Sequence, residues 1–184
     1  MTDLHPICAL GATQPQTRRF GPLTLAENSE LALASVALRR DAASPDLPQP
    51  VPGEWQAAGD IAAFWTGPDQ WMVEGPGLAA TDFAAQIAAR APGCSVTEQT
   101  DGFVAFEITS TTGPGPIRAL LEKLVNVDAH RFTAGHATRT GFHHMSVFVI
   151  RRADDRLALI GMRSAAGTIW HALTDAAEQL EVMA

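Results

Sequence analysis

The chain has 184 residues and a formal net charge of −7 at pH 7, with 46% hydrophobic and 18% charged residues. This length suits one domain or two closely packed halves, and the apolar content supports a buried core, which argues against a disordered chain. The negative charge opposes a general attraction to nucleic acid or to an anionic membrane surface, so we expect neither as a partner.

The beginning of the chain lacks the pattern of a secretion signal. Residues 1–20 contain no basic segment followed by a continuous apolar run, and no stretch of the sequence approaches the roughly 18 uncharged apolar residues of a membrane span. The cysteines, Cys8 and Cys94, lie far apart and belong to no C-x-x-C motif, which is typical of reduced thiols inside the cell. We therefore expect a cytoplasmic protein.

The first forty residues predict an arm followed by a strand. Residues 1–30 contain scattered glycine and proline and show no sustained periodicity, so we expect them to form an N-terminal arm. Residues 31–39 are rich in small and branched apolar side chains and predict a strand. The proline-rich sequence that follows predicts a loop.

A hairpin and a helix are predicted next. The apolar runs 61–65 and 71–73 flank the sequence TGPDQ, in which Pro68 has the φ angle of a turn and Asp69 can bond to nearby backbone. This pattern predicts a β-hairpin. Thr81 is the expected cap of a helix that ends before Pro92-Gly93.

The second half contains the clearest helix. Alternate apolar residues over 104–108 predict a strand, and Pro116 is expected in the first turn of the helix that follows. Helical spacing predicts one buried face for this helix. Its apolar residues are Ile117, Leu120, Leu121, Leu124 and Val125.

The C-terminal part predicts a second hairpin and a final helix. Runs rich in β-forming residues over 145–150 and 156–160 are joined by RRADD and indicate a hairpin. The last helix is expected to present one apolar stripe to the core. The stripe consists of Ile169, Trp170, Leu173, Ala176, Ala177 and Leu180.

These elements indicate an α+β fold, because antiparallel hairpins must bury one apolar face against helices or another sheet. Both halves follow the order strand, connection, hairpin and helix. We therefore expect the arm over residues 1–30 and a single α+β domain over 31–184. That domain would consist of two pseudo-repeated halves of antiparallel strands with covering helices, about 31–93 and 94–184.

Four of the six histidines lie within fifteen residues and form the strongest candidate for a metal site. Their spacing does not place two ligands on one helical face, and neighbouring residues of a strand point to opposite sides. The favoured interpretation is structural, with one of the adjacent histidines packed inward and the other facing solvent or a partner. The four residues are His130, His136, His143 and His144.

Two further patterns fail as catalytic sites. Ser164, His171 and Asp175 share one face of the last helix, but seven helical residues separate the serine from the histidine by about 10.5 Å, too far for proton transfer. A capping serine and a solvated face explain them better. The pair His5 and Cys8 is only half of a zinc motif, and TTGPGP lacks the spacing of a phosphate-binding loop.

An aromatic cluster surrounds the predicted TGPDQW turn. It consists of Trp55, Phe64, Trp65 and Trp71. Such residues either fill a core, which we favour, or anchor a protein interface.

Several motifs, taken in order, resemble the gamma subunits of heterotetrameric sarcosine oxidases. The first is Trp65-Thr-Gly-Pro-Asp-Gln-Trp71, which is similar to the W-x-GPDEW turn of that family. The resemblance covers roughly residues 30–181. Its other parts are residues 96–102 (VTEQTDG), 127–132 (VDAHRF), Gly135, 138–140 (TRT), Arg163-Ser164 and Trp170.

The resemblance implies a small subunit of a complex that oxidises sarcosine to glycine with oxygen and passes the one-carbon unit to tetrahydrofolate. It implies alpha, beta and delta subunits as partners, with the FAD, FMN, NAD and tetrahydrofolate sites in the larger subunits. It also implies a fold similar to the folate-binding part of aminomethyltransferases. Related complexes oxidise other N-methyl amino acids, so the amine substrate stays open.

The leading hypothesis is a non-catalytic subunit that supports assembly or stability, and we assign no catalytic, cofactor-binding or metal residue to this chain. We expect the arm and an exposed apolar surface to lie against a partner. The alternative hypothesis is a stand-alone folate-binding or one-carbon-transfer module. A metal-binding protein built on the histidines is a third.

Overall fold

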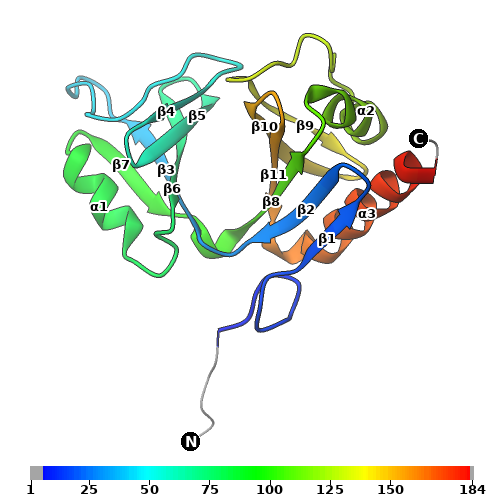
Figure 1. Cartoon of the computed structure of the whole chain (residues 1–184). Coiled ribbons are helices and arrows are strands. Elements are labelled where there is room, and N and C mark those ends of the chain that lie inside the picture. The colour runs from blue at the N-terminus through cyan, green and yellow to red at the C-terminus, as the bar shows by residue number, and fades with distance from the viewer. Residues whose placement is uncertain (1–5, 183–184) are drawn as a thin grey trace, which may run out of the picture.

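The computed structural model describes residues 6–182, which form eleven β-strands, three α-helices and two short 3₁₀ turns (Figure 1). The strands make two antiparallel sheets. None of the helices in this range is long and apolar enough to cross a membrane. The predicted α+β class, with antiparallel sheets covered by helices, is confirmed.

The six-stranded sheet carries two helices on its outer face. Their apolar stripes pack on the leucine, valine and phenylalanine side chains of that face and form the largest core cluster. In order across the sheet, the strands are β1 (Thr17–Phe20), β2 (Leu23–Asn28), β8 (Phe103–Ser110), β11 (Arg156–Met162), β10 (Met145–Ala153) and β9 (Ala137–Phe142), and the helices are α2 (Pro114–Leu124) and α3 (Ala166–Val182).

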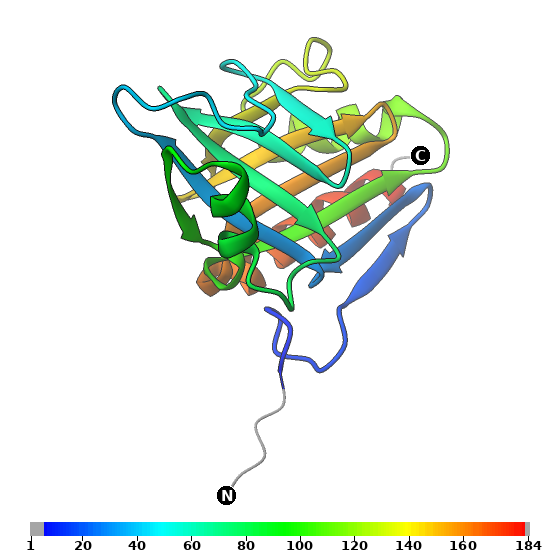
Figure 2. The ribbon, with the colours of Figure 1, turned by 90° about the vertical axis from the view of Figure 1, so that its left-hand side faces the viewer.

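The five-stranded sheet is covered on its outer face by one helix, whose residues Phe83 and Ile87 are buried against it. In Figure 2 this helix lies in front of its sheet, and α3 lies behind the other sheet. The strands, in order, are β4 (Trp55–Ala58), β5 (Ile61–Gly67), β6 (Gln70–Pro76), β3 (Leu31–Leu38) and β7 (Cys94–Glu98), and the helix is α1 (Phe83–Arg90).

The inner faces of the two sheets pack on each other and make a third core cluster. Because side chains of a strand alternate between faces, each central strand contributes to an outer and an inner core. On β10, for example, Val147 and Val149 join the helix-covered core, whereas Phe148 and Ile150 join the core between the sheets. The result is four layers: helix, sheet, sheet and helices (Figure 1).

Most of the expected elements are present. The hairpin around Pro68 and Asp69 is β5–β6, and Asp69 has a positive φ of 56° in its turn. The second hairpin is β10–β11, and the strand over 31–39 is β3. The two helices predicted by periodicity are α2 and α3, and they bury their expected apolar faces.

Helix starts differ from the prediction by one or two residues. Asp82, and not Thr81, caps α1, because its Oδ1 accepts a hydrogen bond from the Ala85 N–H at 3.1 Å. The Thr81 hydroxyl instead donates to the Leu78 carbonyl at 2.8 Å. Helix α2 begins at Pro114, two residues before Pro116.

The prediction of an arm over residues 1–30 is wrong for its second part. Strands β1 and β2 belong to the six-stranded sheet, where β2 pairs with β8 and Leu25 lies opposite Ile108. Leu23 and Leu25 are buried in the helix-covered core. The two leucines lie on the same face of the strand, because its side chains alternate, and the pairing strand lies about eighty residues away in the sequence.

The sheets also do not divide the chain at residue 94. Strand β7 pairs with β3 in the five-stranded sheet, although its residues begin the predicted second half. Strands β1 and β2 join the other sheet, although they precede the predicted first half. Each sheet therefore combines segments from both sides of the expected boundary.

Candidate functional site

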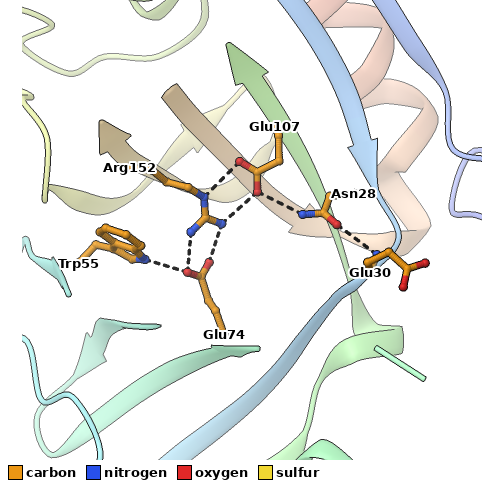
Figure 3. A network of polar contacts seen from close by, with 6 residues as sticks. All are labelled: Asn28, Glu30, Trp55, Glu74, Glu107 and Arg152. Carbon is orange, nitrogen blue, oxygen red and sulfur yellow. Dashed lines mark hydrogen bonds and ion pairs between the residues drawn. The ribbon is translucent and has the colours of Figure 1, made fainter. Parts of the chain in front are cut away.

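A buried ion-pair network lies between the two sheets and joins them (Figure 3). Glu74 comes from β6 of the five-stranded sheet, whereas Glu107 and Arg152 come from β8 and β10 of the six-stranded sheet. All three occupy inner-face positions of their strands, where neighbouring inner positions are apolar. The chain thus places two carboxylates and one guanidinium in an otherwise apolar layer.

The Arg152 guanidinium binds both carboxylates through paired hydrogen bonds. Its Nη1 and Nη2 donate to Glu74 Oε2 and Oε1 at 2.7 and 3.0 Å. Its Nε and Nη2 donate to Glu107 Oε2 and Oε1, both at 3.1 Å. This geometry uses the planar fork of arginine, which lysine could not reproduce.

Trp55 and Asn28 complete the network (Figure 3). The indole N–H of Trp55 donates to Glu74 Oε2 at 2.7 Å, and the Arg152 guanidinium lies 5.5 Å from the centre of the Trp55 ring. The Asn28 amide donates to Glu107 Oε1 at 3.4 Å. Trp55 therefore has a polar role that the aromatic pattern of the sequence did not predict.

The charge of Arg152 is fixed by its surroundings. Glu74 has no exposed surface, and 14% of the Arg152 side chain is exposed. Burial alone would lower the pKa of Arg152, but the Glu74 and Glu107 carboxylates outweigh it and raise that pKa above its ordinary value. Arg152 therefore remains charged at any physiological pH. The arrangement is suited to holding the sheets together and not to proton transfer.

A cavity of about 410 Å³ lies beside the network, where β2 ends and β3 begins. It is partly enclosed by residues 6–15, which are held in place by the buried Glu27 carboxylate. Glu27 Oε1 and Oε2 accept hydrogen bonds from the Leu10 and Gln16 N–H groups at 3.0 and 3.2 Å. Asn28 lines this cavity and also contacts the network.

The candidate metal ligands are dispersed in the structure. His130 Nε2 lies 3.7 Å from Glu122 Oε1, and His136 Nδ1 contacts the Thr133 carbonyl at 3.0 Å. His143 and His144 form the turn between β9 and β10 and are both exposed, so the expectation that one of them packs inward is wrong. Across residues 6–182, no three His, Cys, Asp or Glu side chains come together as metal ligands would.

The serine, histidine and aspartate of the last helix also do not form a site. Ser164 lies in a 3₁₀ turn (Arg163–Ala165) that precedes α3, whereas His171 and Asp175 are exposed on the helix itself. Cys8 and Cys94 are free thiols, and burial raises the pKa of Cys94 while Arg39 opposes that rise. His5 lies outside the described residues.

The other aromatic residues of the predicted cluster are mainly core residues. Phe64 is buried between the sheets. Trp71 is buried on the α1 side, where its indole N–H donates to the Pro50 carbonyl at 3.0 Å. Trp65 is half-buried. The core interpretation thus holds for Phe64 and Trp71.

Sequence reasoning missed the three charged residues of the network. The alternation of Phe106, Glu107 and Ile108 puts Glu107 on the opposite face of its strand, which is buried when a second sheet packs on it. Such a position is costly unless the charge is paired. The partner cannot be read from the pattern, because Glu74 and Arg152 are 78 residues apart.

No protein-family model and no curated protein sequence matches the chain. Among solved structures, a chain of the heterotetrameric sarcosine oxidase from Corynebacterium sp. U-96, in complex with pyrrole 2-carboxylate, matches with a TM-score of 0.70 and 18% identity. The match covers 86% of this chain and 85% of that chain.

The glycine cleavage system aminomethyltransferase T from Bartonella henselae matches with a TM-score of 0.56 and 13% identity. That match covers 80% of this chain but only 44% of the aminomethyltransferase chain. At 18% and 13% sequence identity, the two structural matches establish the fold of this chain alone. The expected similarity to aminomethyltransferases is therefore confirmed at the level of the fold.

Proposed function

We propose that this chain is the gamma subunit of a heterotetrameric sarcosine oxidase, a non-catalytic subunit that supports the assembly or stability of the complex. The observation that carries the proposal is the match to one chain of such an enzyme along 86% of this chain and 85% of that one. A likeness over nearly the whole length of both chains supports a corresponding subunit better than a shared substructure would. The W-x-G-P-D-Q-W motif on the β5–β6 hairpin is a second, independent argument.

The chemistry between the sheets supports a non-catalytic role. The oxygens of Glu74 and Glu107 accept hydrogen bonds from Arg152, Trp55 and Asn28. A general base or acid must be within hydrogen-bond reach of its substrate, and these carboxylate oxygens already accept hydrogen bonds from other side chains of the chain. A heterocyclic cofactor with an N–H edge would also have to displace Arg152 to bind either carboxylate.

In this proposal the redox and one-carbon chemistry belongs to the partner subunits. FAD, FMN, NAD and tetrahydrofolate would bind to the larger chains, and this chain would contact the alpha, beta and delta subunits in the cytoplasm. The complex would oxidise sarcosine, or another N-methyl amino acid, and release glycine or the corresponding demethylated amino acid.

Co-expression with the products of neighbouring genes tests the proposal. This chain, carrying an affinity tag, is expected to capture larger chains that give a flavin absorption spectrum and oxidise sarcosine with release of hydrogen peroxide. The isolated chain is expected to show no such activity. A colourless chain without partners, or peroxide production by the isolated chain, would contradict the proposal.

The alternative function, a folate-binding or one-carbon-transfer module, is favoured by the likeness to aminomethyltransferase T and by the 410 Å³ cavity. Calorimetry with tetrahydrofolate separates the two. Saturable binding near one molecule per chain would support the alternative, and no binding would support the subunit.

A further inference from the structure

A second cavity, which we call the β10–β11 groove, lies in the six-stranded sheet where β10 begins and β11 ends. It has a volume of about 300 Å³. The pairing of β10 with β11 stops at Phe148 and Ile160, and the groove lies beside the beginning of β10 and the end of β11, which do not pair with each other. The groove is lined by Phe103, Arg139, Met145, Ser146, Phe148, Met162, Ala165 and Ile169, of which only Arg139 and Ser146 are polar.

Arg139 supplies an uncompensated positive charge to this groove. Its Nε donates to Ser146 Oγ at 2.8 Å, and its guanidinium lies 5.8 Å from the centre of the Phe148 ring. These contacts orient the side chain and leave both terminal nitrogens for a further acceptor. Within residues 6–182, no carboxylate forms an ion pair with Arg139.

Exposed apolar side chains occur in the groove and elsewhere on the surface. Met162 is 54% exposed and Ile7 is 57% exposed, two of the few large hydrophobic residues on the surface. Arg163, which follows Met162 in the chain, donates from Nη2 to the Ile7 carbonyl at 2.7 Å and so contacts the N-terminal segment. A small molecule in the groove would leave part of the exposed Met162 side chain in water, whereas a polypeptide would cover it.

We propose that the β10–β11 groove is a docking site for an extended segment of a partner polypeptide, which inserts an apolar side chain and pairs a neighbouring carboxylate with Arg139. The positive charge of Arg139 favours a carboxylate in the partner segment. The Phe103, Phe148 and Met162 side chains favour an apolar anchor residue beside it. The proposal rests on the proposed function for the identity of the partner, which would be another subunit of the complex.

A second copy of this chain is a poorer occupant. The groove is a concave surface, so a copy would have to offer a different, protruding surface to it. Such a contact is heterologous and, unless it closes into a ring, forms open-ended filaments. A partner of different sequence avoids this outcome.

Two pairs of matched variants test the docking site in the co-expressed complex. R139Q and M162S alter the groove, whereas R156Q and V51S change an exposed arginine and a 56% exposed valine elsewhere. We expect the groove variants to weaken the affinity for the partner subunits at least about tenfold. The control variants should stay within about twofold of the wild type. Equal binding of all variants would overturn the docking site and leave the proposed function intact.

A phage-displayed library of random peptides, selected on the whole chain, tests the groove without a known partner. The enriched peptides should combine an apolar residue with a nearby aspartate or glutamate and should lose affinity for R139Q and M162S. This result would support the docking site even if the chain captured no flavin-bearing subunit, in which case the proposed function alone would fail. Enriched peptides without an acidic residue, equal binding to both groove variants, or self-association lost in R139Q would overturn it.

Discussion

Replacing Glu74 by alanine should destabilise the fold more than any surface substitution, because its carboxylate is fully buried at the junction of the two sheets. The change removes both hydrogen bonds from Arg152, at 2.7 and 3.0 Å, and leaves the Trp55 indole without its acceptor. Removal of one member of a buried ion pair costs about 3–5 kcal/mol. Glu107 still pairs with Arg152, so we expect the lower end, about 3 kcal/mol.

Urea denaturation followed by tryptophan fluorescence and circular dichroism measures this effect. For a chain of this size, a loss of about 3 kcal/mol corresponds to a fall in Tm of roughly 6–12 °C. Glu178→Ala is the matched control, because Glu178 forms an exposed ion pair with Arg18 and should change the stability by less than about 1 kcal/mol. If the unfolding free energy of Glu74→Ala stayed within about 0.5 kcal/mol of the wild-type value, the cost of burying the Glu74 carboxylate would equal the stabilisation from its hydrogen bonds. The network would then not stabilise the packing of the two sheets.

Three further predictions concern single residues. Arg151 is buried, and within residues 6–182 its Nε and Nη1 have no acceptor, so Arg151→Met should raise the unfolding free energy by about 1 kcal/mol; a loss in urea denaturation would contradict this. Burial raises the pKa of Glu98, but hydrogen bonds from Thr100 and other groups outweigh it and hold the pKa below 4.5. Glu98→Gln should therefore reduce stability at neutral pH, and the difference should shrink as the pH falls below about 4.5; a pH-independent difference in Tm would contradict this. Gly75→Ala would place a Cβ 2.5 Å from the Phe83 ring and should cost about 1–3 kcal/mol, whereas an unchanged Tm would show that α1 moves freely.

The elements that sequence reasoning predicted are those with a strong local signal. The apolar spacing of Ile117, Leu120 and Leu121 identifies α2 without knowledge of its partner, and all three residues are buried. Pro68 and Asp69 mark the β5–β6 turn in the same way. Local chemistry therefore sufficed for the main helices and hairpins.

The elements that were missed depend on partners far away in the sequence. Strand β2 has only two large apolar residues at alternate positions, Leu23 and Leu25, and the next residue on that face is the charged Glu27. Its pairing with β8 and the burial of Glu27 under residues 6–16 decide its structure. Neither contact can be derived from a short sequence window.

The buried network was missed for the same reason. Glu74, Glu107 and Arg152 lie on three strands from two sheets, and each looks like a solvent-facing charge in its own segment. Only the packing of the sheets shows that all three face the same apolar layer. The histidines show the converse: they are close in sequence, but within residues 6–182 they do not come together as metal ligands would.

The central claim is that this chain supports a flavin-containing complex without performing its chemistry. The most direct test is to express the larger subunits with and without this chain and to measure the yield of assembled complex and its sarcosine-dependent peroxide production. We predict that omission of the chain sharply lowers the yield of stable, active complex. Larger subunits that assemble and oxidise sarcosine equally well without it would contradict the claim.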